Sequence, residues 1–275
     1  MKLRCNILLS AALINRISAF TKLFPARKVQ KITSYLLILP VILLPSHSYA
    51  MHISEGILPF SWALFWFVAS APFLALGLRT LARRSAADPS SKPLVGMVAA
   101  VVFVISCMPV PVPMAGTCSH PCGTGLAAVL LGPTLGVVAA AVALLIQALF
   151  LSHGGLSTWG ANLFSMGVMG SFAGYMLFRG LRAAGIGVVF AAFVAGVACD
   201  WATYAGTAMI MAAGIKGNSP FWPLAGKIAL AFVPTQLPLG IIEGAITAGM
   251  VSLLRKKRPD LLARTALAAT EGERR

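Results

Sequence analysis

The stretch Tyr49-Ala50-Met51-His52-Ile53-Ser54-Glu55-Gly56 separates a leader-like segment from the apolar body of the chain. Before it lie a basic segment, the apolar run 35–44 and the small residue Ser48, and a second small residue, Ala50, is the second residue of the stretch. This order, with an apolar run of roughly 7–15 residues, is typical of a secretory signal. We therefore expect residues 1–50 to be a leader cleaved after Ala50. Translation starting at Met51 would give the same Met51-His52 terminus.

The composition indicates a membrane protein. Hydrophobic residues make up 58% of the 275 residues and charged residues 11%, and the mean hydropathy is +0.86. A single soluble core cannot bury so many apolar residues. Since crossing a bilayer takes about 20 apolar residues per helix, we expect an all-α membrane protein with seven transmembrane helices. Their expected positions are Pro59–Leu81, Leu94–Val112, Thr124–Gly132, Thr134–Ser152, Leu163–Phe178, Val188–Ala213 and Ile228–Leu254. The third is short and is expected to be partly buried in protein.

The positive charges predict the orientation in the membrane. The formal net charge is +15, and outside the leader the basic residues gather beside apolar stretches, a pattern of cytoplasmic loops rather than of nucleic-acid binding. These clusters are Arg79, Arg83 and Arg84, then Arg179 and Arg182, then 255–258. Seven spans then place the mature N-terminus outside and the tail, residues 255–275, in the cytoplasm. The loops of His120 and His153 fall on the same outer side as Met51.

A free Met51-His52 terminus would form a metal chelate. Its amine, the amide nitrogen of His52 and the His52 imidazole supply three coplanar nitrogens, a set that suits Ni(II) or Cu(II), with Co(II) also possible. His120 is the expected fourth ligand, because its Gly- and Pro-rich loop can bring an imidazole close to another backbone. The alternatives are an exposed terminal histidine and a loop histidine satisfied by hydrogen bonds.

Four further polar residues could support this site or the packing of the helices. His153 could be a ligand, a donor that orients His120 or the amine, or a turn cap; we favour the orienting role because four nitrogens already fill the metal plane. Glu55 could contact a neighbouring loop or balance the charge of the cation. Asn162, like Gln147, is expected to make polar contacts between helices.

Other motifs are less specific. Asp200 and Glu243 lie within apolar spans, where a charge is costly, so each is expected to make an interhelical hydrogen bond or to serve transport. Cys118 and Cys122 flank His120 without zinc-ribbon spacing; they fit the start of a helix or, alternatively, a disulfide. Ala71-x-x-x-Ala75 would permit close helix approach. The chain has neither a G-x-x-x-x-G-K-[ST] loop nor an H-E-x-x-H motif, so we expect no enzyme activity.

Four motifs resemble the CbiM/NikM family, the substrate-capturing membrane components of energy-coupling-factor transporters for cobalt and nickel. They are Met51–Pro59, Gly116–Gly125, His153–Asn162 and Gln236–Gly244, within a similarity that covers about 51–254. The resemblance implies a six-helix bundle like that of vitamin-binding components, with an extra N-terminal helix that tucks the Met-His terminus inside. Cys122 departs from the family pattern, where threonine is expected.

The same resemblance assigns ligands and partners. It implies metal binding by the Met51 amine, the His52 amide nitrogen and imidazole, and the His120 imidazole. It also implies a transmembrane coupling protein, a pair of cytoplasmic ATPases and a small accessory membrane protein, in the cell membrane. A stand-alone channel or secondary carrier is the alternative, with Asp200 and Glu243 as its candidate coupling groups. The sequence leaves the choice between cobalt and nickel open.

Overall fold

The computed structural model describes residues 49–50, 52–108, 110–112 and 117–262, which belong to one unit, Ser48–Arg275. Met51 and most of the expected leader lie outside the described residues, as does the tail beyond 262. Cleavage of the leader therefore stays a prediction.

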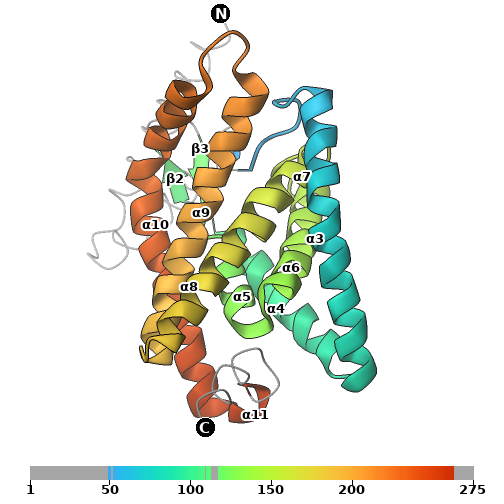
Figure 1. The fold of residues 1–275 in the computed structure, drawn as a ribbon, viewed down its shortest axis with the longest axis vertical. Helices are drawn as coiled ribbons and strands as arrows, with labels where there is room; N and C mark the ends of the chain where they lie inside the picture. The colour runs from blue at the N-terminus through green and yellow to red at the C-terminus, as the bar shows by residue number, and fades with distance from the viewer. Residues whose placement is uncertain (1–48, 51, 109, 113–116, 263–275) are drawn as a thin grey trace, which may run out of the picture. The chain divides into compact units, whose positions relative to one another are not determined.

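The described part of the chain is a helical bundle with one small sheet (Figure 1). Its helices are α3 (Phe60–Ala87), α4 (Ser91–Ser106), α5 (Thr124–Leu131), α6 (Pro133–Phe150), α7 (Trp159–Asn162), the π-helix η1 (Leu163–Gly170), α8 (Ser171–Ala183), α9 (Val188–Ile215), α10 (Phe221–Lys257) and α11 (Pro259–Leu262). The helices α7, η1 and α8 run on as one helical stretch of 25 residues. Each of the seven expected segments thus contains a helix, and the all-α membrane class is confirmed.

Five helical stretches of the described residues are long and apolar enough to cross a bilayer: α3, α6, α7–α8, α9 and α10. The helix α4 is shorter, with 16 residues, and α5 has only 8. Every residue of α5 is buried, as expected for a short helix enclosed by protein. Seven as a count of crossing segments stays a prediction.

The sheet has no counterpart among the sequence-based expectations. It consists of β1 (Tyr49–Ala50), β2 (Val110–Val112) and β3 (Thr117–Ser119), in the order β1-β3-β2. β1 is parallel to β3, and β2 is antiparallel to it. The expected helix to Val112 is wrong at its end, since α4 stops at Ser106. Prolines at 109, 111 and 113 lack the N–H that a helix needs and disfavour helical geometry in the residues before them.

The helix α3 contacts the bundle through small residues. Its buried residues are Ala63, Ser70 and Gly77, which recur every seven positions. The hydroxyl of Ser70 donates to the Gly160 carbonyl at 2.6 Å, and a Cβ on Gly77 would lie 2.5 Å from the Thr134 carbonyl oxygen. The pair at 71 and 75 is instead exposed. Many large apolar side chains of α3 are exposed, among them Phe60, Leu64 and Val68, as expected for a helix that faces lipid.

The basic helix ends gather at one end of this unit. The C-terminal ends of α3, α8 and α10 all point toward the lower end in Figure 1, and their last turns carry basic residues. Those residues are Arg84 in α3, Arg182 in α8 and 255–257 in α10. The arrangement fits the positive-inside prediction, which stays a prediction for the orientation itself.

Candidate metal centre

Three imidazoles from separate segments meet in one cluster. His52 precedes α3, His120 precedes α5, and His153 follows α6. The ring centroids of His52 and His120 lie 4.9 Å apart, and each lies 5.0 Å from that of His153. One nitrogen from each ring lies within 4.8 Å of the other two. The sequence placed these histidines on one side of the membrane, and the structure places them in contact.

Burial keeps the three rings neutral. Burial lowers the pKa of His52 well below its usual range, and the neighbouring His120 and His153 lower it further. Burial, followed by the proximity of His153, lowers the pKa of His120 to about 3. Burial also lowers the pKa of His153. At neutral pH each ring therefore offers a nitrogen lone pair, the form in which histidine binds a metal.

The residue after His52 is fixed by side chains of the α6–α7 region. The amide N–H of Ile53 donates to Asn162 Oδ1 at 2.8 Å, and Asn162 Nδ2 donates back to the Ile53 carbonyl at 3.1 Å. The hydroxyl of Thr158 donates to the same carbonyl at 2.5 Å. Asn162 was expected in a loop, but it ends the short helix α7. Its amide pairs with this backbone much as a neighbouring strand would.

Two glycines allow the loop after α6 to approach this stretch closely. Gly154 has φ +80°, and a Cβ there would lie 3.1 Å from the His52 Cβ. A Cβ on Gly155 would lie 2.7 Å from both the N and the Cα of Glu55, so this position excludes any side chain. The Glu55 carboxylate accepts from the Ser157 amide at 3.1 Å, and hydrogen bonding by Ser157 lowers the pKa of Glu55. The loop contact considered for Glu55 is present, and its role in balancing the charge of a cation stays a prediction.

Met51 lies outside the described residues, but both of its covalent neighbours border the segment that carries His120. Ala50 pairs with Cys118 in the parallel β1–β3 ladder. The ring of His52 packs against the ring of His120. Ala50 and His52 therefore both lie beside the loop that supplies the expected fourth ligand.

The family model for the cobalt uptake substrate-specific transmembrane region, CbiM, matches residues 52–261. The chain belongs to the CbiM family. The cobalt transport protein CbiM of Geobacter sulfurreducens is 62% identical over 235 residues, or 86% of this chain and 68% of that protein. The CbiM of Sorangium cellulosum is 56% identical over 78% of this chain and 95% of its own length.

Solved structures agree with this CbiM membership. A crystal structure of a transition metal transporter superposes with a TM-score of 0.67 at 28% identity, over 75% of this chain and 93% of that one. A truncated transition metal transporter gives a TM-score of 0.66 at 27% identity, over 75% and 99% of the two chains. The chain is thus a membrane component of the CbiM cobalt uptake family.

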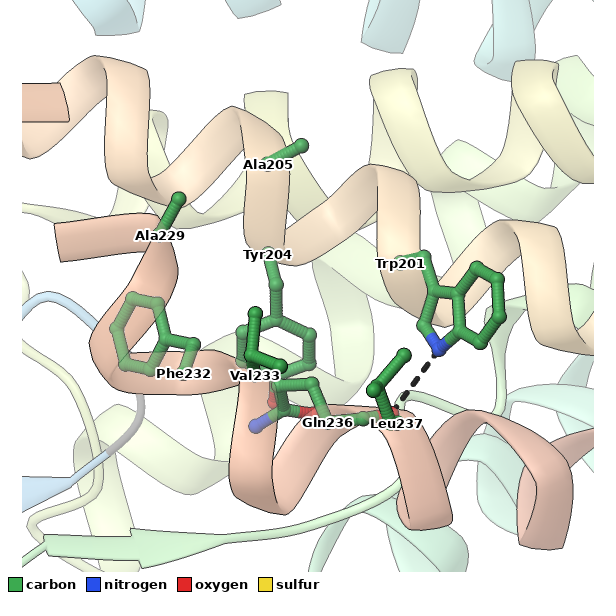
Figure 2. A pocket seen from close by; sticks show the side chains of 8 residues that line it. All are labelled: Trp201, Tyr204, Ala205, Ala229, Phe232, Val233, Gln236 and Leu237. Atoms are coloured by element: carbon green, nitrogen blue, oxygen red, sulfur yellow. Dashed lines mark hydrogen bonds between the residues drawn. The ribbon is translucent and has the colours of Figure 1, made fainter. Parts of the chain in front are cut away.

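In this CbiM-family chain the His120 loop is also held from α9 and α10. The Tyr204 hydroxyl donates to the His120 carbonyl at 3.3 Å, and Gln236 Nε2 donates to the Ser119 hydroxyl. Tyr204 and Gln236 also line a cavity of about 170 Å³ between these two helices, where Trp201 Nε1 donates to the Gln236 carbonyl at 3.0 Å (Figure 2). The cavity walls are mostly apolar, so it offers no set of metal ligands.

The two intramembrane acids lie in a second buried cluster. Glu243 accepts from the backbone N–H of Cys122 at 2.5 Å and of Gly125 at 3.4 Å. It therefore satisfies the N-terminus of α5, which has no side-chain cap of its own. Asp200 Oδ1 accepts from the Cys122 thiol at 3.7 Å, and among the described residues its Oδ2 has no partner. The acids make polar contacts between helices and do not join the histidine cluster.

Cys122 is a reduced, buried residue just before α5, as expected for the start of a helix. The side chain of Cys118 lies outside the described residues. Sequence reasoning missed the specific role of Gln147, which contacts His52, and it missed Thr158 altogether. A lone glutamine in the otherwise apolar α6 was the available signal, but periodicity does not say which buried group it faces.

Proposed function

We propose that this chain is the metal-capturing membrane component of an ATP-driven energy-coupling-factor importer for Co(II) or Ni(II). The ion is bound by the amine of Met51, the amide nitrogen and imidazole of His52, and the imidazole of His120. The observation that carries the proposal is the convergence of neutral imidazoles around a stretch that begins one residue after Met51. Membership of the CbiM family supports it independently.

The donor atoms favour a nitrogen-preferring transition metal. Among the described residues, the cluster around His52 contains imidazoles and neither a thiolate nor a carboxylate. Nitrogen donors suit cobalt, nickel and copper better than the hard cations Mg²⁺ and Ca²⁺. The curated relatives from Geobacter and Sorangium are named cobalt transport proteins, which favours cobalt. The Irving–Williams order makes nickel a chemically competent alternative.

His153 has a supporting place in this scheme. Its ring touches both ligand imidazoles, and its Nε2 is buried without a hydrogen-bond partner among the described residues. It orients the His120 ring by contact, while Asn162 and Glu55 hold the loops on either side of it. The ion enters from outside. A transmembrane coupling protein, two cytoplasmic ATPases and a small accessory membrane protein complete the importer.

The test is to change the terminus and measure cobalt affinity. A chain that begins at Met51 should bind cobalt at least a hundredfold more tightly than the same chain with one alanine before Met51 or with an acetylated amine. Acetylation removes the chelating amine, whereas the added alanine moves the amine one residue further from His52; both leave every side chain in place. Equal affinities would remove the amine from the site. An alanine added after Arg275 serves as the control and should change nothing.

A secondary carrier remains the second candidate, because Asp200 is fully buried and its Oδ2 has no partner among the described residues. Such a residue could carry a coupling proton. Cobalt uptake into vesicles that hold this chain alone and a proton gradient would favour the carrier. Uptake that requires the ATPases and ATP favours the importer.

A further inference from the structure

Gln147 of α6 is the described residue whose side chain meets the outer edge of the His52 ring, at 3.1 Å from Nε2. We propose that Gln147 is a positioning residue that holds His52 as its Nε2–H tautomer and so presents Nδ1 to the ion. This inference rests on the proposed function and deepens it.

Neighbouring groups on α4 fix the direction of the Gln147 amide. The Ser106 hydroxyl donates its hydrogen to the Phe103 carbonyl at 3.0 Å, so the Ser106 oxygen is left to accept. It accepts from Gln147 Nε2 at 2.9 Å, and the Cys107 sulfur lies 3.5 Å from the same nitrogen. Both hydrogens of the Gln147 amide are therefore directed toward α4. Its carbonyl oxygen faces His52.

The direction of the amide decides which His52 nitrogen carries hydrogen. A carbonyl oxygen can only accept, so the hydrogen of the neutral ring must be on Nε2. The lone pair then lies on Nδ1. This is the nitrogen required for the chelate, because the His52 amide nitrogen, Cα, Cβ, Cγ and Nδ1 close a six-membered ring with the ion. The rigid imidazole cannot turn Nε2 toward its own amide nitrogen.

Burial makes this hydrogen bond effective. Gln147 and Ser106 are both fully buried, and His52 is 7% exposed, so water does not compete for the ring. Outer partners that orient a metal-binding histidine typically contribute 10- to 100-fold in metal affinity. Two successive hydrogen bonds, from Gln147 to Ser106 and from His52 to Gln147, therefore let the packing of α4 against α6 determine the tautomer of His52.

Two substitutions of nearly equal size separate this role from space filling. Gln147→Met fills the same volume without an acceptor, and it should weaken cobalt binding about 10- to 100-fold. Gln147→Glu keeps the acceptor and should bind cobalt within a few-fold of the wild type. A residue that only filled space would give the reverse order, because methionine fits an apolar helix and glutamate buries a charge. That reverse order would overturn the proposal.

Nitrogen NMR of histidine-labelled, metal-free protein reads the tautomer directly. The wild type should show His52 with a protonated Nε2 and a bare Nδ1, and Gln147→Met should show a mixture. A wild type with hydrogen on Nδ1 would overturn the proposal. A wild type with the expected tautomer that binds no cobalt would overturn the proposed function, and with it the positioning role, while the tautomer assignment would stand.

Two further variants guard against trivial outcomes. Thr247→Val replaces a buried hydroxyl of α10 that has no hydrogen-bond partner among the described residues, and it should leave the affinity unchanged. Ser106→Ala, a smaller change, removes the group that directs the Gln147 amide. It should also mix the tautomers of His52 and lower cobalt affinity several-fold. If His52 in Ser106→Ala still showed a single tautomer, the proposed effect of Ser106 on His52 through Gln147 would be contradicted, even if Gln147→Met failed to fold.

Discussion

At the scale of single residues, Asn162 holds the main chain of Ile53 by two hydrogen bonds, as Gln147 holds the ring of His52 by one. Asn162→Leu removes both of its hydrogen bonds to Ile53 and leaves the Ile53 N–H buried without its acceptor. An unmet buried group costs about 1–3 kcal/mol, so cobalt affinity should fall about 5- to 150-fold. Isothermal titration with cobalt measures this loss. An unchanged affinity would mean that the position of Ile53 does not matter to the site.

Gly155 tests whether the loop after α6 must contact the segment around Glu55. Gly155→Ala would place a Cβ 2.7 Å from the backbone nitrogen of Glu55, so the loops must separate and cobalt binding should weaken at least tenfold. Gly96→Ala in α4 is the matched control, because a Cβ there meets nothing within 4 Å and alanine favours the helix. If both variants bind cobalt equally well, the close approach of the loops is not needed.

The pKa values predict an acid-sensitive apo protein. The pKa of buried His120 falls to about 3 from an ordinary 6.5. Between these values the unfolded chain binds a proton that the folded chain does not, so stability decreases as pH falls below about 6.5. Each such histidine contributes about 1.4 kcal/mol per pH unit. Thermal unfolding of metal-free protein in detergent, measured from pH 7 to pH 4, should show this decrease.

His120→Asn provides the comparison for that pH series. It removes one titrating ring, so its unfolding temperature should depend less steeply on pH than that of the wild type. Parallel curves for the two proteins would show that His120 is not held neutral in the fold.

At the scale of elements, the helix α5 depends on a residue more than a hundred positions away in the sequence. Glu243→Gln replaces one of the two carboxyl oxygens that accept from amides at the N-terminus of α5 with an NH₂ group, which cannot accept. A buried amide N–H left without its acceptor costs about 1–3 kcal/mol, and the His120 loop should loosen with it. The unfolding temperature in detergent should fall.

Asp200→Asn is the comparison for Glu243→Gln in the test of α5. Among the described residues Asp200 accepts from the Cys122 thiol and from no backbone N–H. Asp200→Asn should therefore lose less stability than Glu243→Gln. Equal losses would contradict the specific role of Glu243 as the cap of α5. Loss of cobalt uptake in Asp200→Asn, with stability and binding intact, would instead support the secondary carrier.

The elements also show which parts of the fold can be predicted from the sequence. Apolar runs and Pro133 correctly predicted the helical segments and the division between α5 and α6, because these depend on local composition. The small sheet was not predicted, since its strands have two or three residues each and β1 pairs with β3 across 68 positions. The contacts of Gln147 and Glu243 were likewise out of reach. Each is a polar residue among mostly apolar neighbours in its helix, and only packing decides what it faces.

At the scale of the whole molecule, basic helix ends predict the orientation in the membrane. A cysteine placed at exposed Ser219, between α9 and α10, should react with an impermeant maleimide in intact cells. A cysteine at exposed Lys257 should react only after the membrane is opened. Labelling above the wild-type background, which includes the native cysteines, is the measurement. The opposite pattern would place the histidine cluster on the cytoplasmic side and exclude capture from outside.

The histidine cluster was predicted in part because charge and hydropathy act over the whole chain. They placed His52, His120 and His153 at one membrane face, but the distances among them follow from three loops whose geometry depends on glycines and buried amides. Tautomers and hydrogen-bond directions follow from neighbours on other helices. These tautomers and directions could be assigned only from the three-dimensional structure.

The central claim is that a cobalt ion is bound by nitrogen atoms of the Met51-His52 terminus and by His120. X-ray absorption on cobalt-loaded protein, with the N-terminus verified by mass spectrometry, tests it most directly. The account predicts a mature chain that begins at Met51 and a first shell of nitrogen atoms with imidazole scattering, which diminishes in His120→Ala. A sulfur- or carboxylate-containing shell, or the same nitrogen shell on a chain that begins elsewhere, would contradict it.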